Sequence, residues 1–445
     1  MNISAGLTVA LVQVLALVAS ADAAVSQAVY PAIVKPGTES ATPADPTLAT
    51  LQAERSGPDE SPRVLEAEAA RFLAEISNLE ASKGPYADEL SQQLEGLGAL
   101  YARFEDYPQA IELFKRAIHV SRINGGLNSP EQVPVTERLI EIYLAQGEVD
   151  KADKRHSYLY RIAISHKDSS PLQTAQAMMK YAEWQRVTYL IGLGRTPNSR
   201  LLEMHDTYKD VIRLLAATEE EYSLKLVPPL RGLLAAQYLL SIRPMQAAVG
   251  KPTLASTAGE DNGHDYRVRR GFLRRMSFKQ GKATLAALRE IHLKNPASSL
   301  VAVAKISVDL GNWLLWNNRH RDAYDAYGQA WSELSIMVGG EQKLKEIFDE
   351  PASLSALVNP NTDLGFGSPA QPADGAALEW ATILLHISSE GRASKLEVVE
   401  SQPPKKSSML HKTLRELSST RYRPRFVDGK PVDSQIVKFF EYSDN

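Results

Sequence analysis

Apolar positions recur at helical spacing along most of the chain. Between residues 62 and 350, Leu, Ile, Ala and aromatic residues return every three or four positions, which predicts a succession of amphipathic α-helices. Beyond a stretch rich in Pro and Gly the period shortens, and Trp380, Thr382 and Leu384 alternate with their neighbours as in a β-strand. The pattern therefore predicts a mainly α protein whose long helical domain is followed by a small α+β domain.

The helical region contains similar segments in which small and bulky residues keep fixed offsets. The clearest copy lies within residues 85–122 and consists of Leu97, Gly98, Tyr101, Ala110, Phe114 and Ala117. A last copy keeps the same offsets at Leu310, Gly311, Leu314, Ala323, Tyr327 and Ala330. A copy between them retains Tyr143, Gly147 and Ala152, with Ile140 in the place of Gly98. Small residues allow two antiparallel helices to approach closely, and the bulky residues fill the space around them.

These segments resemble tetratricopeptide repeats. The step from Gly98 to Ile140 is 42 residues, longer than the usual period of about 34, because a loop is inserted around residues 124–130; the longer repeats of kinesin light chains are similar. Residues 171–243 and 267–296 match poorly and are interpreted as degenerate repeats. The resemblance implies an α-solenoid over residues 62–350 that binds proteins or peptides.

The last 70 residues predict two strands, a helix and further strands. A turn at residues 388–391 separates the first two strands, Leu410, Leu414 and Leu417 mark one face of the helix, and residues 422–426 and 436–442 follow as strands. One motif stands out, formed by Gly391, Tyr422, Pro424, Phe426, Gly429, Pro431 and Val432. Residues 376–445 thereby resemble the C-terminal domain of TonB, which implies a ββαβ fold with these residues in structural roles.

The N-terminus is typical of an exported protein. The apolar run of residues 5–19 ends in an Ala-x-Ala pattern at residues 21–23, which predicts a signal peptide over residues 1–23 and a periplasmic or secreted product. The alternative is that this segment stays as an inner-membrane anchor facing the periplasm. Residues 24–61 and 351–375, rich in Pro, Gly and small residues, are expected to be linkers.

The sequence offers no constellation for chemistry. Cysteine is absent, the nine histidines are scattered without metal-ligand spacing, and no phosphate-binding loop or nucleophile turn is present. We therefore expect no catalytic, cofactor or metal site, and no enzymatic activity. The near balance of 50 basic and 53 acidic residues also argues against a general nucleic-acid binder.

Two clusters leave alternatives open. The densest positive charge comprises Arg267, Arg269, Arg270, Arg274, Arg275, Lys279 and Lys282. It is either a surface for an anionic partner or a solvated helix whose long side chains cover apolar neighbours, and the solvated helix is favoured. Trp313, Trp316 and Trp331 either line a binding groove or pack in the core, and packing is favoured for at least two of them.

The leading functional hypothesis is an exported interaction scaffold that binds protein or peptide partners of the cell envelope through its repeats. Membrane contact is expected only if the N-terminal segment is retained. The alternative is an anchored TonB-type energy transducer acting on outer-membrane receptors. A third hypothesis, an enzyme with an unrecognised site in the repeats, has no residues to support it.

Overall fold

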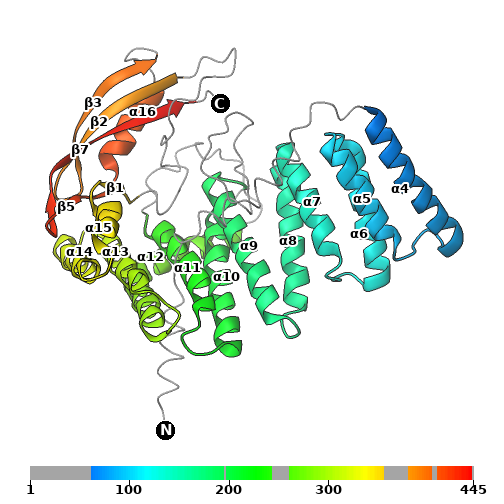
Figure 1. Ribbon diagram of the computed structural model, residues 1–445, viewed down its shortest axis with the longest axis horizontal. Helices are drawn as coiled ribbons and strands as arrows, with labels where there is room; N and C mark the ends of the chain where they lie inside the picture. The colour runs from blue at the N-terminus through cyan, green and yellow to red at the C-terminus, as the bar shows by residue number, and fades with distance from the viewer. Residues whose placement is uncertain (1–61, 195–196, 243–259, 355–378, 403–407, 443–445) are drawn as a thin grey trace, which may run out of the picture. The chain divides into compact units, whose positions relative to one another are not determined.

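The computed structural model describes residues 62–194, 197–242, 260–354, 379–402 and 408–442 (Figure 1). The predicted signal peptide and first linker lie outside these residues, as does most of the second linker. The described chain forms two compact units, one ending at Trp184 and the other beginning at Gln185, so that the boundary falls within a helix.

The unit that ends at Trp184 is wholly helical in its described part. Its helices are α4 (Pro62–Lys83), α5 (Leu90–Arg103), α6 (Tyr107–Gly125), α7 (Gln132–Ala145), α8 (Val149–Ser165) and most of α9 (Pro171–Leu190). Consecutive helices pack on one another, and residues at helical spacing such as Leu90, Leu94 and Leu97 are almost completely buried between them. This arrangement agrees with the expected succession of amphipathic helices.

The unit that begins at Gln185 continues the helices and ends in strands. After the end of α9 come α10 (Pro197–Thr218), the 3-10 turn η1 (Leu224–Leu226), α11 (Val227–Ser241), α12 (Glu260–Lys294), α13 (Leu300–Trp316), α14 (His320–Ser335) and α15 (Gly340–Phe348). The strands are β1 (Ala352–Ser353), β2 (Glu379–Ile387), β3 (Ala393–Gln402), β4 (Tyr422–Arg423), β5 (Arg425–Val427), β6 (Lys430–Val432) and β7 (Ser434–Tyr442), with α16 (Ser408–Ser419) after β3.

The same turn joins the two helices of four pairs, α5/α6, α7/α8, α9/α10 and α13/α14. In the turns after α5, α7, α9 and α13, one residue adopts a positive φ: Glu105, Gly147, Gly192 and Asn318. The next amide donates to a carbonyl five residues earlier, as in the bond from Asp106 N to Tyr101 O of 2.9 Å. This is the Schellman ending of a helix, in which a left-handed residue satisfies carbonyls left free by the last turn.

Close approach of helices explains the signature glycines. A Cβ placed on Gly98 would stand 2.7 Å from the Phe114 ring, and one on Gly311 would stand 2.4 Å from the Tyr327 ring. Both contacts join a first helix to the aromatic residue 16 positions later on the second helix. In the second copy Ile140 replaces the glycine, and the residue 16 positions later is His156, which stacks on Trp184 at 4.2 Å between ring centroids.

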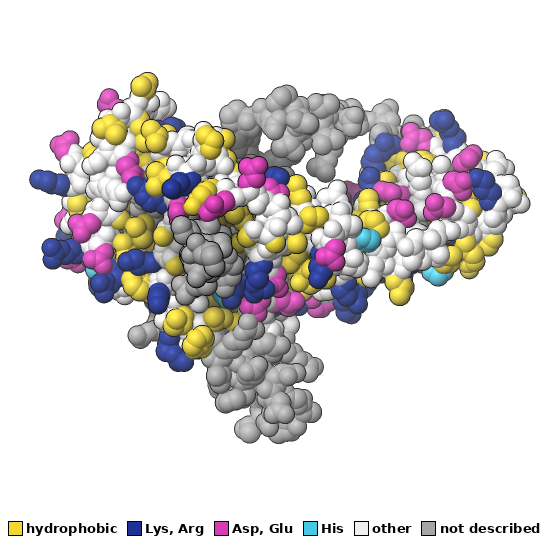
Figure 2. Space-filling view, turned by 90° about the horizontal axis from the view of Figure 1, so that it is seen from below, with side chains coloured by type: hydrophobic (Ala, Val, Ile, Leu, Met, Phe, Trp, Pro, Cys, Tyr) yellow, Lys and Arg dark blue, Asp and Glu magenta, His cyan; other side chains and the backbone are white. Residues whose placement is uncertain are grey.

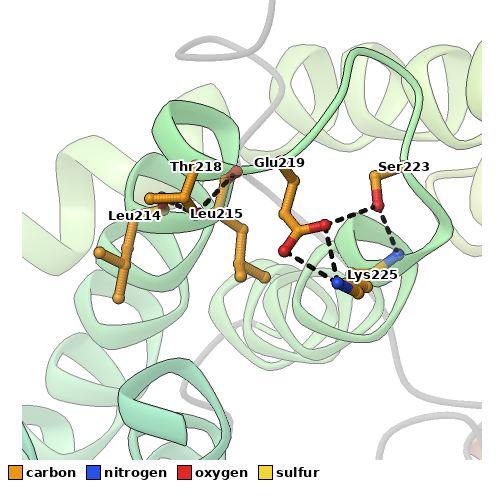
Figure 3. Close-up of polar contacts among 6 residues, drawn as sticks. All are labelled: Leu214, Leu215, Thr218, Glu219, Ser223 and Lys225. Carbon is orange, nitrogen blue, oxygen red and sulfur yellow. Dashed lines mark hydrogen bonds and ion pairs between the residues drawn. The ribbon is translucent and has the colours of Figure 1, made fainter. Parts of the chain in front are cut away.

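The connection between α10 and η1 is closed by side chains (Figure 3). The carboxylate of Glu219 accepts hydrogen bonds from Lys225 Nζ (3.0 Å) and Ser223 Oγ (3.5 Å), and Ser223 Oγ in turn accepts from the Lys225 amide at 3.3 Å. Thr218 Oγ1 donates to the Leu214 carbonyl at the end of α10. Serine and carboxylate oxygens here accept hydrogen bonds from an amide and an ammonium group that have no backbone partner in the turn.

The C-terminal strands form a three-stranded antiparallel sheet in the order β3-β2-β7, with α16 against one face (Figure 1). Ala381, Ile383, Leu385 and Ile387 on β2 are buried against Leu410 and Leu417 of α16. The order of these elements along the chain is β2, β3, α16 and β7, which agrees with the expected strand–strand–helix–strand succession.

Two expectations about this region were wrong in detail. Residues 422–426 were expected to form one strand, but they belong to β4 and β5, which pair with different partners on either side of Pro424. Proline has no amide proton, so it interrupts a ladder of backbone hydrogen bonds. The expected linker from Pro351 begins as β1, which pairs with β4, and Leu354 is only 1% exposed.

Candidate functional site: the first helices and the C-terminal motif

The structure places most repeat-signature residues in the cores of the helical pairs. Those that are fully or nearly fully buried are Leu97, Gly98, Ala110, Phe114, Ala117, Tyr143, Ala152, Gly311, Leu314, Ala323, Tyr327 and Ala330. Tyr101 and Leu310 are partly buried, and Gly147 is exposed at its turn with φ of 72°. The buried residues among them hold the helices together.

Charged side chains form a row across the first helices of the pairs in the unit that ends at Trp184. Arg138 Nε on α7 lies 3.0 Å from Glu95 Oε1 on α5, and Lys180 Nζ on α9 lies 2.8 Å from Glu137 Oε1 on α7. About half of each basic side chain is exposed. Exposed ion pairs are each worth about 0–1 kcal/mol, so a ligand could exchange these partners at little free-energy cost.

A more buried charged cluster lies where α11 and α13 meet the C-terminal motif. Arg231 NH2 of α11 lies 3.5 Å from Asp309 Oδ2 of α13, and their side chains are 10% and 17% exposed. Burial raises the pKa of the Asp309 carboxyl, while the nearby Arg231 and Arg423 guanidinium groups act in the opposite direction. A charge held this way is expensive to leave unpaired, so the cluster fixes α11, α13 and the motif in one arrangement.

The C-terminal motif packs against helices as well as against its own sheet. Tyr422 belongs to the sheet core, and a Cβ on Gly391 would stand 2.1 Å from the Tyr422 carbonyl oxygen. Phe426 instead enters the core of α13–α15, with ring centroids 5.2 Å from Tyr327 and 4.9 Å from Phe348. The β5–β6 hairpin therefore covers the last helices, and its buried aromatic is not part of the sheet core.

Polar contacts surround this junction. Arg425 NH2 lies 2.8 Å from Asp349 Oδ1, and Arg423 donates to the Ile347 carbonyl with its guanidinium carbon 5.6 Å from the Phe348 ring centroid. Tyr324 OH donates to the Ser389 carbonyl at 2.9 Å. The remaining motif residues are Pro424, which is buried, and Gly429, Pro431 and Val432, which are partly exposed. Gly429 lies against the Trp331 ring with φ of 74°.

The three tryptophans pack within the helices. Trp313 is fully buried against Gly281, and its indole nitrogen donates to the Phe278 carbonyl at 3.3 Å. Trp316 and Trp331 are partly buried and pack against the core of α13–α15. Core packing therefore accounts for all three, and the groove interpretation is not needed.

Ionisable groups in the described residues do not converge on a reaction centre. His156 has its pKa lowered to about 3 by burial, but it stacks on Trp184 inside the helical core. No group of three or more His, Asp or Glu side chains in the described ranges is arranged to hold a metal ion. Within the same ranges, no helix has the length and apolar character needed to cross a bilayer.

Sequence reasoning missed several structural positions. Gly232 and Gly281 are further close-approach glycines, whose Cβ atoms would stand 2.1 Å from Tyr208 and 2.4 Å from Trp313. A glycine inside an otherwise helical pattern is a signal that could have indicated them. The pairing of Arg231 with Asp309 has no such signal, because the two residues are 78 positions apart.

Comparison with known proteins adds no relative. No protein-family model matches this chain, and no curated protein is detectably similar to it.

Proposed function

We propose that this protein is an exported interaction scaffold built from tetratricopeptide-type repeats, and that it acts by binding other proteins or peptides of the cell envelope. The observation that carries the proposal is the repetition of one helix–turn–helix unit. Four pairs share the Schellman turn, and two share the glycine–aromatic contact at a separation of 16 residues. Stacked pairs of this kind present successive first helices side by side as an extended surface.

The charged row on the first helices supplies side chains for such a surface. Arg138 and Glu141 are exposed on α7 and lie three residues apart, on one face of the helix. Figure 2 shows Lys and Arg side chains interspersed with Asp and Glu on the face that it presents. An alternating charge pattern suits a partner with charges of both signs, and it gives specificity more than affinity.

Site-specific photo-crosslinking tests the proposal in the native host. A photoreactive residue at position 138 or 141 should give discrete protein adducts, because these positions face the proposed ligand. The same residue at Lys154, exposed on the second helix α8, is the matched control and should give none. Absence of adducts at all positions, or equal adducts at both sets, would refute binding by the first helices.

A TonB-type transducer is the second candidate function. It is favoured by the order β3-β2-β7 with one helix on the sheet, which leaves β3 and β7 as edge strands among the described elements. Edge strands can accept a strand from a partner. Coupling also requires a retained N-terminal anchor. N-terminal sequencing and membrane fractionation decide between the two: a mature chain beginning near Ala24 in the soluble envelope fraction would leave only the scaffold.

A further inference from the structure

The long helix α12 carries a basic face whose cations form no ion pair within the described part of the chain. From Tyr266 to Arg289, 24 consecutive residues contain eight Lys and Arg residues and no Asp or Glu. No other segment of the helical region has this composition. With 35 residues, α12 is also about twice as long as its neighbours α11 and α13, with 15 and 17 residues (Figure 1).

The C-terminal two thirds of α12, from residue 271 onward, has two distinct faces. The packed face consists of Leu273, Ser277, Gly281, Thr284, Leu285, Leu288 and Ile291, all of which are buried. The opposite face consists of Phe272, Arg275, Lys279, Lys282 and Ala286, at the same helical spacing, and all of these are exposed, as is the adjacent Arg274. These cationic residues are therefore accessible to solvent on the face opposite to the packed one.

These cations lack the partners that other surface cations have. Within the described residues, Arg274, Arg275, Lys279 and Lys282 form no ion pair, whereas Lys83, Lys115, Lys151 and Lys180 each lie within 4.0 Å of a carboxylate. The side chain of Phe272 is 53% exposed beside them. An unpaired cationic stripe with an exposed aromatic ring is a surface that lacks its partner.

We propose that this face of α12 binds the surface of a bilayer containing anionic phospholipid, with the Phe272 ring inserted at the level of the headgroups. The stripe from Phe272 to Lys282 runs about 15 Å along the outside of a helix. A convex, straight face fits a plane, whereas peptides and single-stranded nucleic acids are usually held in grooves. In helices that lie on a membrane surface, attraction of cations to anionic lipid and insertion of apolar side chains at the interface both contribute to binding.

The net charge of −3 does not oppose this contact. At physiological ionic strength charges are screened beyond about 8 Å, so the local stripe governs the interaction. The sequence led us to expect membrane contact only through the N-terminal segment. The α12 surface would act without that segment, and independently of partners bound by the first helices.

Vesicle flotation of the full-length chain tests the proposal. The protein should bind vesicles of phosphatidylcholine and phosphatidylglycerol more tightly than vesicles of phosphatidylcholine alone, and added salt should weaken the difference. Replacing Arg274, Arg275, Lys279 and Lys282 by Gln should lower the partition coefficient about five-fold per cation, and several-hundred-fold together. The matched control replaces Lys83, Lys115, Lys151 and Lys343, four ion-paired lysines with the same total charge, and this variant should bind vesicles like the native chain.

A further variant separates a lipid surface from any polyanion. Phe272→Ser should weaken binding to anionic vesicles several-fold and leave binding to heparin or polyglutamate unchanged. Equal loss for the two sets of four cations would overturn the proposal, as would binding to the soluble polyanions as tight as binding to vesicles. Failure of the native chain to prefer anionic vesicles would overturn it as well. Circular dichroism of every variant shows that the fold is retained.

Discussion

Phe426 gives the sharpest test of the packing between the C-terminal motif and the helices. Its side chain is 3% exposed and contacts the rings of Tyr327 and Phe348, although it comes from a strand 78 residues beyond Phe348. Replacing a buried Phe by Ala removes the transfer free energy of the ring and leaves a cavity, at a cost of about 3–5 kcal/mol. We expect Phe426→Ala to destabilise α14 and α15 together with the C-terminal strands.

The matched control is Val427, the next residue of β5, whose side chain is 43% exposed. Because it points away from the core, Val427→Ala should change stability by no more than about 0.5 kcal/mol. A double-mutant cycle with Phe348→Ala should give a coupling free energy of about 0.5–1.5 kcal/mol, the usual range for a pair of aromatic rings in contact.

Hydrogen exchange read by mass spectrometry measures this effect locally, which matters because a chain of two units need not unfold in one step. In Phe426→Ala, amides of α14 and α15 should exchange faster than in the native chain, while those of α5–α8 should not change. If α14 and α15 keep their native protection while only the strands lose theirs, then the hairpin does not stabilise the helices and the reasoning fails.

Three further outcomes follow from particular residues. Gly311→Ala should lower the melting temperature, because the new Cβ would stand 2.4 Å from the Tyr327 ring. Gly328 is also helical, but nothing lies within 4 Å of its Cβ position, so Gly328→Ala should be neutral or should stabilise the fold by up to about 1 kcal/mol. Gly147→Ala should lower the unfolding free energy by about 1–2 kcal/mol in urea titrations, since its φ is 72°. Burial lowers the folded-state pKa of His156 to about 3, so the unfolded chain binds a proton at mildly acidic pH that the folded chain does not. The unfolding free energy should therefore be highest above pH 6.5 and should fall by about 2 kcal/mol between pH 6.5 and 5. In the same urea titrations His156→Phe should remove this fall.

The helices and the order of the C-terminal elements could be predicted because they depend on local pattern. The spacing of Leu90, Leu94 and Leu97 requires one apolar face, and only a helix gives residues at that spacing a common face. The alternation along β2 indicates a strand, although the residues that the structure buries are Ile383 and Leu385 and not the alternating set of Trp380, Thr382 and Leu384. For the same reason the signature glycines, at fixed offsets from bulky residues, indicate close contacts between helices.

The surface of α12 shows where local pattern was insufficient. The sequence located the basic cluster and favoured a solvated helix over a surface for an anionic partner. Sequence alone does not show whether a Lys or Arg side chain covers a neighbour, pairs with a carboxylate or faces solvent. Exposure of Lys279 and Lys282, together with the lack of ion pairs for them in the described ranges, favours the interpretation that an anionic surface binds there.

The sequence by itself determined the helices with their apolar faces and the order of the main C-terminal elements. Only the tertiary structure decided which faces meet. Phe426 packs on helices that end near residue 348, and Arg231 pairs with Asp309. Within the expected linker, β1 pairs with β4. Periodicity shows that an apolar face of a helix or strand needs a packing partner, but any other element with an apolar face of suitable shape could be that partner. The choice among them depends on packing between residues far apart in the chain, which no local pattern records.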